Sequence, residues 1–219
     1  MGTSTDGTTW TTITQSVFDL WDSINAIAYG NGIFVAGGNG KMATSTDGVT
    51  WTAVVEEDST RFKYISINTI AYGNGKFVAN GSIQHYSDSG ILTSTDGVTW
   101  KATDSTFDSV ISTIVYANGK FVAGGYSQNS SGILTSTDGV KWTAVEDSTL
   151  DISILTIANG NGKLVAGGYN GKMATSTDGV KWTAVTQNVF SLSTIDAIAY
   201  GNGKFVIVSG NKMAYSSGN

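Results

Sequence analysis

Short apolar runs alternate with turn-forming residues along the whole chain, and the same order of runs returns several times. In its clearest copy the runs occupy residues 67–72, 76–79, 91–94 and 99–102. Each run has the length and the β-branched and aromatic content of a short strand, and no segment shows a helical period. The pattern therefore predicts a unit of four antiparallel strands that is repeated along an all-β chain.

The turns between the runs carry a second regular signal. An Asn-Gly pair separates the first two runs of every copy and supplies the two positive-φ residues of a type I′ hairpin turn. Asp-Gly separates the third and fourth runs, and its Ser and Asp side chains can accept hydrogen bonds from turn amides. The Asn-Gly pairs begin at Asn31, Asn74, Asn118, Asn161 and Asn202.

A tryptophan closes nearly every copy. Ser-Thr-Asp-Gly-x-x-Trp, called the box below, ends at residues separated by 41, 49, 42 and 40 positions. Four-stranded units of about 40 to 45 residues are typical of β-propeller blades. We expect outer strands near residues 8–13, 50–55, 99–103, 141–145 and 181–185, and inner three-strand sets at 24–45, 67–94, 111–136, 154–176 and 195–216. The box residues are Asp6, Trp10, Asp47, Trp51, Asp96, Trp100, Asp138, Trp142, Asp178 and Trp182.

The two ends of the chain complement each other in this scheme. Residues 3–13 supply one outer strand, and the last copy stops after its third strand. Pairing the two would complete a fifth blade and remove exposed strand edges. The sequence predicts a five-bladed β-propeller over residues 1–219, one domain in which the N-terminal outer strand pairs with the C-terminal three strands.

The box resembles the Asp-box, or BNR, repeat of sialidase-like propellers, and the resemblance covers essentially the whole chain. Here Gly follows Asp directly, so the phrase is one residue shorter than the usual Asp-box. The resemblance implies that the box is a structural hairpin on the face away from the active site. We therefore interpret the box aspartates and tryptophans as residues of the fold.

Composition narrows the classes of function. The formal charge of −5 argues against nucleic acid and anionic membranes as partners, and the chain has no apolar run long enough for membrane insertion. One histidine cannot build a multi-histidine metal site, and one arginine cannot build the cluster that sialidases need for a substrate carboxylate. The pairs Asp19 with Asp22 and Glu56 with Glu57 suit solvated loops better than glycoside hydrolysis. We expect no enzyme, no cofactor, no metal and a monomer.

The copies differ mainly in two sets of links, between fourth and first strands and between second and third strands. Antiparallel strands put both sets at the same end of the sheets, where recognition loops are usual, although unconstrained drift explains the variation equally well. The long links of the second and third blades gather aromatic, amide and charged residues that suit a sugar or a peptide. The predicted binding residues are Arg61, Tyr64, His85, Tyr86, Asp88, Tyr126, Gln128 and Asn129.

A second set has five-fold regularity. An apolar residue recurs in each link before a first strand and could floor five equivalent pockets, but such residues more often fill the gap between neighbouring blades. The set is Phe18, Phe62, Phe107, Leu150 and Phe190.

The sequence favours a non-enzymatic recognition module, a lectin-like or adhesin-like glycan binder with several weak sites. The rival is an engineered or recently amplified repeat scaffold without a ligand, favoured by the near-identical copies and the absence of Pro and Cys. A sialidase-like glycoside hydrolase is the third interpretation. A natural chain of the first kind would suit an extracellular, virion or cell surface.

Overall fold

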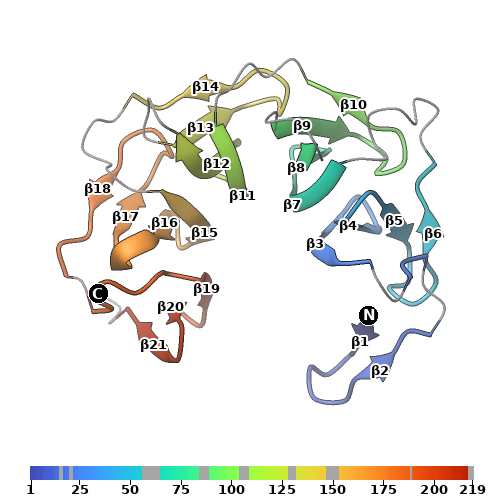
Figure 1. Ribbon diagram of the computed structural model, residues 1–219, viewed down its shortest axis with the longest axis horizontal. Coiled ribbons are helices and arrows are strands. Elements are labelled where there is room, and N and C mark those ends of the chain that lie inside the picture. Colours follow the sequence, from blue (N-terminus) through green and yellow to red (C-terminus); the bar gives the residue numbers. More distant parts are fainter. Residues whose placement is uncertain are drawn as a thin grey trace. The chain divides into compact units, whose positions relative to one another are not determined.

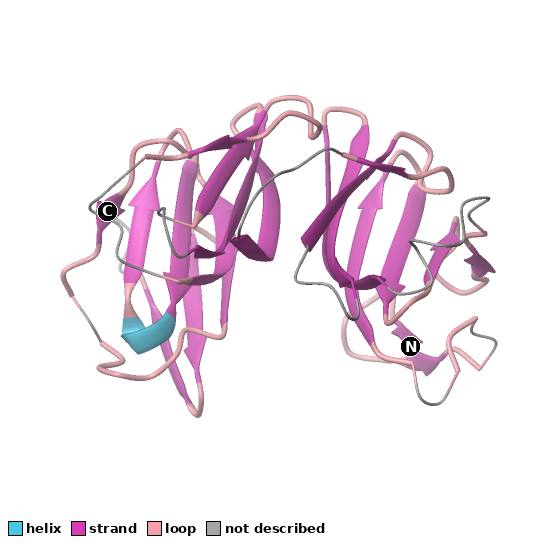
Figure 2. Ribbon diagram, turned by 45° about the horizontal axis from the view of Figure 1, so that its top comes forward, coloured by secondary structure: helices cyan, strands magenta, loops and turns pink. Residues whose placement is uncertain are grey.

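The computed structural model describes residues 1–14, 17–19, 22–55, 65–83, 89–103, 109–127, 132–146, 153–187 and 189–216. Within these ranges the regular elements are strands in antiparallel sheets, with one short 3-10 turn (Figure 2). The chain divides into two compact units, Met1–Ala102 (unit 1) and Thr103–Asn219 (unit 2). The all-β prediction is confirmed. Closure of the sheets into a single ring depends on how the two units combine, and it stays a prediction.

Unit 1 contains a small N-terminal hairpin and two four-stranded sheets, each in the order of the sequence (Figure 1). The hairpin is β1 (Gly2–Thr3) and β2 (Thr11–Thr12); the first sheet is β3 (Ile24–Gly30), β4 (Ile33–Gly38), β5 (Met42–Ser45) and β6 (Thr52–Ala53); the second is β7 (Ile65–Gly73), β8 (Lys76–Ile83), β9 (Ser89–Ser94) and β10 (Lys101–Ala102).

Unit 2 contains two four-stranded sheets and a final sheet of three strands. The first is β11 (Ser109–Ala117), β12 (Lys120–Ser127), β13 (Ile133–Ser136) and β14 (Thr143–Ala144); the second is β15 (Ile154–Gly160), β16 (Lys163–Gly168), β17 (Met173–Ser176) and β18 (Thr183–Ala184), with the 3-10 turn η1 (Tyr169–Gly171) before β17; the last is β19 (Ala197–Gly201), β20 (Lys204–Ser209) and β21 (Lys212–Tyr215).

The five Asn-Gly turns adopt the predicted backbone conformation. Their asparagines have φ between 46° and 51°, and the glycines that follow have φ between 72° and 82°. Only glycine and, less readily, asparagine tolerate this left-handed region, which is why the pair recurs without change. Each turn joins the first two strands of its sheet in tight antiparallel register, as in Tyr72 opposite Phe77.

Neighbouring sheets pack face to face through apolar side chains. In unit 1 the second sheet contributes Ile67, Phe77 and Trp100 to a buried cluster that the first sheet completes with Val35 and Met42. A Cβ on Gly37 would lie 2.8 Å from the Ile67 side chain, so this glycine permits the close approach of the two sheets. In unit 2 Gly124 and Gly167 take the equivalent place against the next sheet: the nearest side chains to their added Cβ atoms are those of Ile154 and Ile195.

The N-terminal segment differs from its prediction. Residues 3–13 were assigned to an outer strand alone, but β2 pairs with β1, with Gly2 opposite Thr12 and Thr3 opposite Thr11. Met1-Gly2-Thr3-Ser4 repeats the third-strand phrase Met42-Ala43-Thr44-Ser45, so β1 corresponds to the end of a third strand. β1, which the first box turn connects to β2, is the strand that pairs with β2. The last sheet has three strands in the described part of the chain.

Candidate functional site

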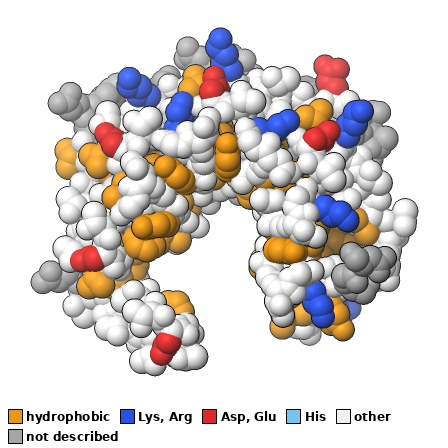
Figure 3. Space-filling view, turned by 180° about the vertical axis from the view of Figure 1, so that it is seen from behind, with side chains coloured by type: hydrophobic (Ala, Val, Ile, Leu, Met, Phe, Trp, Pro, Cys, Tyr) orange, Lys and Arg blue, Asp and Glu red, His pale blue; other side chains and the backbone are white. Residues whose placement is uncertain are grey.

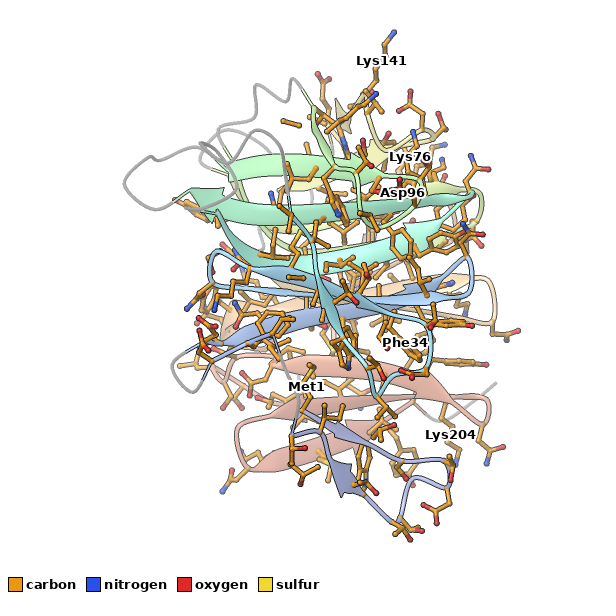
Figure 4. The ribbon with its side chains drawn as sticks, turned by 90° about the vertical axis from the view of Figure 1, so that its right-hand side faces the viewer. Met1, Phe34, Lys76, Asp96, Lys141 and Lys204 are labelled. Atoms are coloured by element: carbon orange, nitrogen blue, oxygen red, sulfur yellow. The ribbon has the colours of Figure 1, made fainter. Side chains whose placement is uncertain are left out.

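The two ends of each sheet have different characters. One end, called the constant end, carries the Asn-Gly turns and the box turns. In the second sheet of unit 1 these two turns lie close together: Lys76 adjoins the Asn-Gly turn, and Asp96 lies in the box turn (Figure 4). The other end, the variable end, carries the links between second and third strands and between fourth and first strands. A function that differs between copies can lie only where the copies differ, which directs attention to the variable end.

The box forms the same hydrogen-bonded turn in all five copies. In the third copy Ser94 Oγ donates to Asp96 Oδ1 (2.9 Å), and that oxygen also accepts the backbone N–H groups of Val98 (2.9 Å) and Thr99 (2.7 Å). Trp100 Nε1 donates to the carbonyl oxygen of Gly97 at 2.9 Å. Equivalent bonds occur at Asp6, Asp47, Asp138 and Asp178. The carboxylates are engaged within their own turns, as the structural interpretation of the box requires.

These hydrogen bonds favour the ionised carboxylate. The Thr99 and Val98 amides and the Ser94 hydroxyl lower the pKa of Asp96 to about 2, despite an opposing contribution from burial. The Thr50 and Val49 amides lower the pKa of Asp47 to about 2. A general acid at neutral pH needs a raised pKa, so the box aspartates are unsuited to that role.

Acid should weaken the fold through these turns. A carboxyl group whose pKa is lower in the folded state than in the unfolded state stabilises the fold at pH values above its unfolded-state pKa. This stability is lost as the pH falls through the folded-state pKa. We expect the melting temperature to fall between about pH 4 and about pH 2, and less steeply in the double variant Asp47→Asn, Asp96→Asn. Thermal unfolding across this pH range measures it, with Glu146→Gln, an exposed residue outside the box, as the control. An unchanged slope in the double variant would show that other groups govern acid unfolding.

The carboxylate pair Asp19 and Asp22 is occupied by a lysine. Lys41 Nζ lies 2.7 Å from Asp19 Oδ2 and 2.6 Å from Asp22 Oδ2. The hydrogen bond from Lys41 lowers the pKa of Asp22, and the hydrogen bond from the backbone N–H of Asp19 adds to this effect. The group is an ion-paired contact between a variable link and the residue before β5, and the lowered pKa of Asp22 does not suit a general acid for glycoside hydrolysis. Glu56 and Glu57 lie outside the described residues.

Exposed tyrosines mark the variable end of unit 2. Tyr126, at the end of β12, is 49% exposed and lies opposite the exposed Val110 of β11. Tyr169, in η1, is 51% exposed and follows the second of two glycines as Tyr126 does. Both tyrosines therefore hold the same position in the sequence repeat, in successive sheets of one unit. Tyrosine offers an apolar face and a hydroxyl group to a ligand while losing few rotatable bonds.

The link that follows β18 carries a further exposed apolar residue. Leu192, between β18 and β19, is 84% exposed, whereas Phe190 of the same link is buried against Met173 and Ile195. The backbone N–H of Ile195 donates to the carbonyl oxygen of Gly168 at 2.9 Å, which holds the link against the residue that precedes Tyr169. Leu192 is thus exposed on a link whose backbone is fixed by a hydrogen bond. Val110, Tyr126, Tyr169 and Leu192 are called the unit 2 patch below.

The structure describes few of the predicted binding residues. Of this set the structure describes Tyr126, which is exposed at the variable end; its role in binding stays a prediction. The others, Arg61, Tyr64, His85, Tyr86, Asp88, Gln128 and Asn129, lie outside the described residues. Of the five-fold apolar set, Phe18 and Phe190 are buried in packing clusters, which favours gap filling over open pockets, and Phe62, Phe107 and Leu150 lie outside the described ranges.

Sequence reasoning missed Tyr169 and Leu192. Tyr169 had an available signal, because Gly167-Gly168-Tyr169 repeats Gly124-Gly125-Tyr126. Leu192 had none, because an exposed and a buried apolar residue look alike in an irregular link. In the described ranges no cluster of His, Asp or Glu is arranged to hold a metal ion. Nor does this part of the chain contain a helix long and apolar enough to span a membrane.

No family model and no curated protein matches this sequence. Solved structures do. YCF48 from Cyanidioschyzon merolae aligns with a TM-score of 0.67 over 90% of this chain and 68% of its own at 16% identity. Virginiamycin B lyase from Staphylococcus aureus, in an inactive form with quinupristin, aligns with a TM-score of 0.68 over 88% and 64% at 14% identity. These are β-propeller proteins. The fold is of the β-propeller class.

Two other structural neighbours bear on the alternatives raised by the sequence. The nidogen/laminin complex aligns with a TM-score of 0.64 over 89% of this chain and 75% of the matched chain at 12% identity. A computationally designed protein, Ika8, aligns with a TM-score of 0.53 over 88% and 70% at 13% identity. At such identities the likeness establishes the fold alone, so activity has to be argued from the surface of this chain.

Proposed function

We propose that the chain is a non-enzymatic recognition module that binds an extended peptide or protein segment through the unit 2 patch. The observation that supports this most is that Tyr126 and Tyr169 hold the same position in the repeat and are both half exposed, with the exposed Val110 opposite Tyr126 and the exposed Leu192 on the next link. Isolated exposed apolar residues need no explanation, but two tyrosines that recur at one position of the repeat provide aromatic anchors of the kind that dominate binding energies.

A peptide is a better match than the glycan predicted from the sequence. Sugar recognition needs several convergent hydrogen-bond donors and acceptors, whereas the patch is mainly aliphatic and aromatic. Apolar side chains of a peptide can pack between the rings while its backbone bonds to the tyrosine hydroxyls. The structural neighbours agree with this choice: YCF48 has been solved bound to D1 peptide, and the nidogen/laminin structure is a protein–protein complex.

The class of ligand can be tested directly. The immobilised chain should select peptides rich in apolar and aromatic residues from a random displayed library, and it should retain little from a glycan array. Enrichment of glycans with no peptide consensus would overturn the peptide proposal and restore the lectin interpretation. No enrichment in either screen would favour the ligand-free scaffold.

A further inference from the structure

The constant end of unit 2 carries a set of lysines that unit 1 mostly lacks. Three follow the Asn-Gly turns and two directly precede the box tryptophans: Lys120, Lys141, Lys163, Lys181 and Lys204. At the corresponding positions unit 1 has an isoleucine and a lysine after its Asn-Gly turns and a threonine in each of its boxes. The lysines are therefore a property of this unit and not of the repeat.

Contacts between the first two sheets of unit 2 join these turns into one surface. Asn118 Nδ2 donates to the carbonyl oxygens of Gly162 (3.3 Å) and Thr177 (2.8 Å), both in turns of the next sheet. Lys120 reaches the same sheet, since a Cβ added to Gly179 would lie 3.9 Å from its Cδ. The Asn-Gly turn of one sheet thus lies against the box turn of the next. Figure 3 shows this end of unit 2 on its right-hand side, with lysine side chains in blue.

The lysine charges at this end are not balanced locally. The carboxylates among them are Asp138 and Asp178, and each accepts two backbone N–H groups of its own box turn at 2.8 Å. None of the five lysines forms an ion pair with a described residue. Five lysines against two aspartates leave a formal charge of +3 at these turns, whereas the rest of the sequence carries −8. An acidic chain thus has a basic surface, which attracts anionic groups.

Exposed valines adjoin two of the lysines. Val140 and Val180 directly precede Lys141 and Lys181 in their boxes, and both valines are exposed. Each box turn therefore presents an apolar and a cationic side chain next to each other. A ligand that complements the surface has carboxylates and apolar side chains close together along its own chain.

This surface suits carboxylates better than the phosphates of a nucleic acid. Phosphate recognition favours the bidentate guanidinium group of arginine or a cluster of free backbone N–H donors. All five cations here are lysines, and the backbone N–H groups of both box turns already donate to the box aspartates. The charge of −8 on the rest of the chain repels a long polyanion, whereas a short acidic segment stays close to the lysines.

We propose that the constant end of unit 2 binds a short acidic segment of a partner protein, in which aspartate or glutamate residues alternate with apolar side chains. The carboxylates of the segment pair with the lysines, and its apolar side chains contact Val140 and Val180. The surface lies at the opposite end of the sheets from the unit 2 patch. It is therefore a second binding surface, and it does not depend on the peptide site proposed above.

A labelled peptide in which glutamates alternate with valines tests this proposal by fluorescence anisotropy at low ionic strength. The parent chain should bind this peptide and should not bind its counterpart with glutamine in place of glutamate. The double variant Lys141→Thr, Lys181→Thr should bind about fivefold to tenfold more weakly, as expected for the loss of two exposed ion pairs. Its melting temperature should be unchanged, because the boxes of unit 1 have threonine at this position. Added salt should weaken binding by the parent more than binding by the variant.

The matched control is Lys172→Thr, Lys212→Thr, which removes the same charge from the variable end of unit 2. This variant should bind the acidic peptide as the parent does. Equal weakening in the two double variants would show an effect of net charge alone and overturn the proposal. Tighter binding of duplex DNA or of anionic phospholipid vesicles than of the peptide would overturn it as well. Peptides selected by the unit 2 patch should bind Lys141→Thr, Lys181→Thr as they bind the parent, so failure of either site is distinguishable from failure of the other.

Discussion

Replacing Trp100 with alanine should lower the free energy of unfolding by about 3 to 5 kcal/mol, the usual cost of emptying a large buried aromatic site. The indole is 4% exposed, packs on Phe77 and donates a hydrogen bond to the Gly97 carbonyl oxygen. Chemical denaturation followed by circular dichroism measures the loss.

Trp10→Ala is the matched control for this change. It removes the same side chain and the same turn hydrogen bond, but from an indole that is largely in solvent. At concentrations where the chain is a single copy we expect a change within about 0.5 kcal/mol. Equal losses in the two variants would contradict the packing described for the box. A stable Trp100→Ala variant that had lost ligand binding would make the tryptophans a binding set.

Gly160→Ala should destabilise unit 2 by about 1 to 3 kcal/mol, because a Cβ there overpacks the contact between two sheets. The added carbon would lie 2.0 Å from Cγ of Tyr200, so the ring or the strand has to move. Gly30 stands in the same relation to Tyr72 in unit 1. In β11 the residue equivalent to Gly160 is Ala117, and β15 of the next sheet has Asn159 where the other copies have tyrosine.

Gly201→Ala provides the comparison for this prediction. Gly201 occupies the same place in β19, yet an added Cβ meets nothing within 4 Å. Its substitution should be neutral or slightly stabilising, since alanine restricts the unfolded chain more than glycine does. Thermal unfolding of the two variants side by side gives the difference. A Gly201→Ala variant as unstable as Gly160→Ala would show that another group covers this position in solution.

The regular part of the structure was predictable because it is encoded locally. Asn31-Gly32 and its copies specify their turn through backbone sterics alone, and the box specifies its turn through Ser and Asp oxygens within a few residues. Because the same turns recur in each copy, each copy folds into a similar sheet. At the N-terminus the structure adds a pairing that the sequence prediction did not include, because Met1-Gly2-Thr3 repeats a third-strand phrase and β1 pairs with β2. Closure of the ring stays a prediction.

The site was less predictable for a physical reason. Residues in links are constrained by tertiary contacts rather than by a period, so Phe190 and Leu192, two positions apart, have opposite exposures. His85 and Arg61 are predicted binding residues because the chain has one histidine and one arginine, and both lie outside the described residues. The feature that unites Tyr126 and Tyr169 is a shared position after two glycines, and comparison of the copies residue by residue is what exposes it.

The claim that recognition belongs to the variable end of unit 2 rests on those two tyrosines. The most direct measurement is the Kd of a selected peptide for the double variant Tyr126→Ala, Tyr169→Ala. The control is Tyr29→Ala, whose tyrosine is at least as exposed but adjoins an Asn-Gly turn at the constant end. We expect the double variant to bind at least tenfold more weakly with an unchanged melting temperature, and Tyr29→Ala to bind as the parent does. Undiminished binding by the double variant, or a loss confined to Tyr29→Ala, would contradict the account.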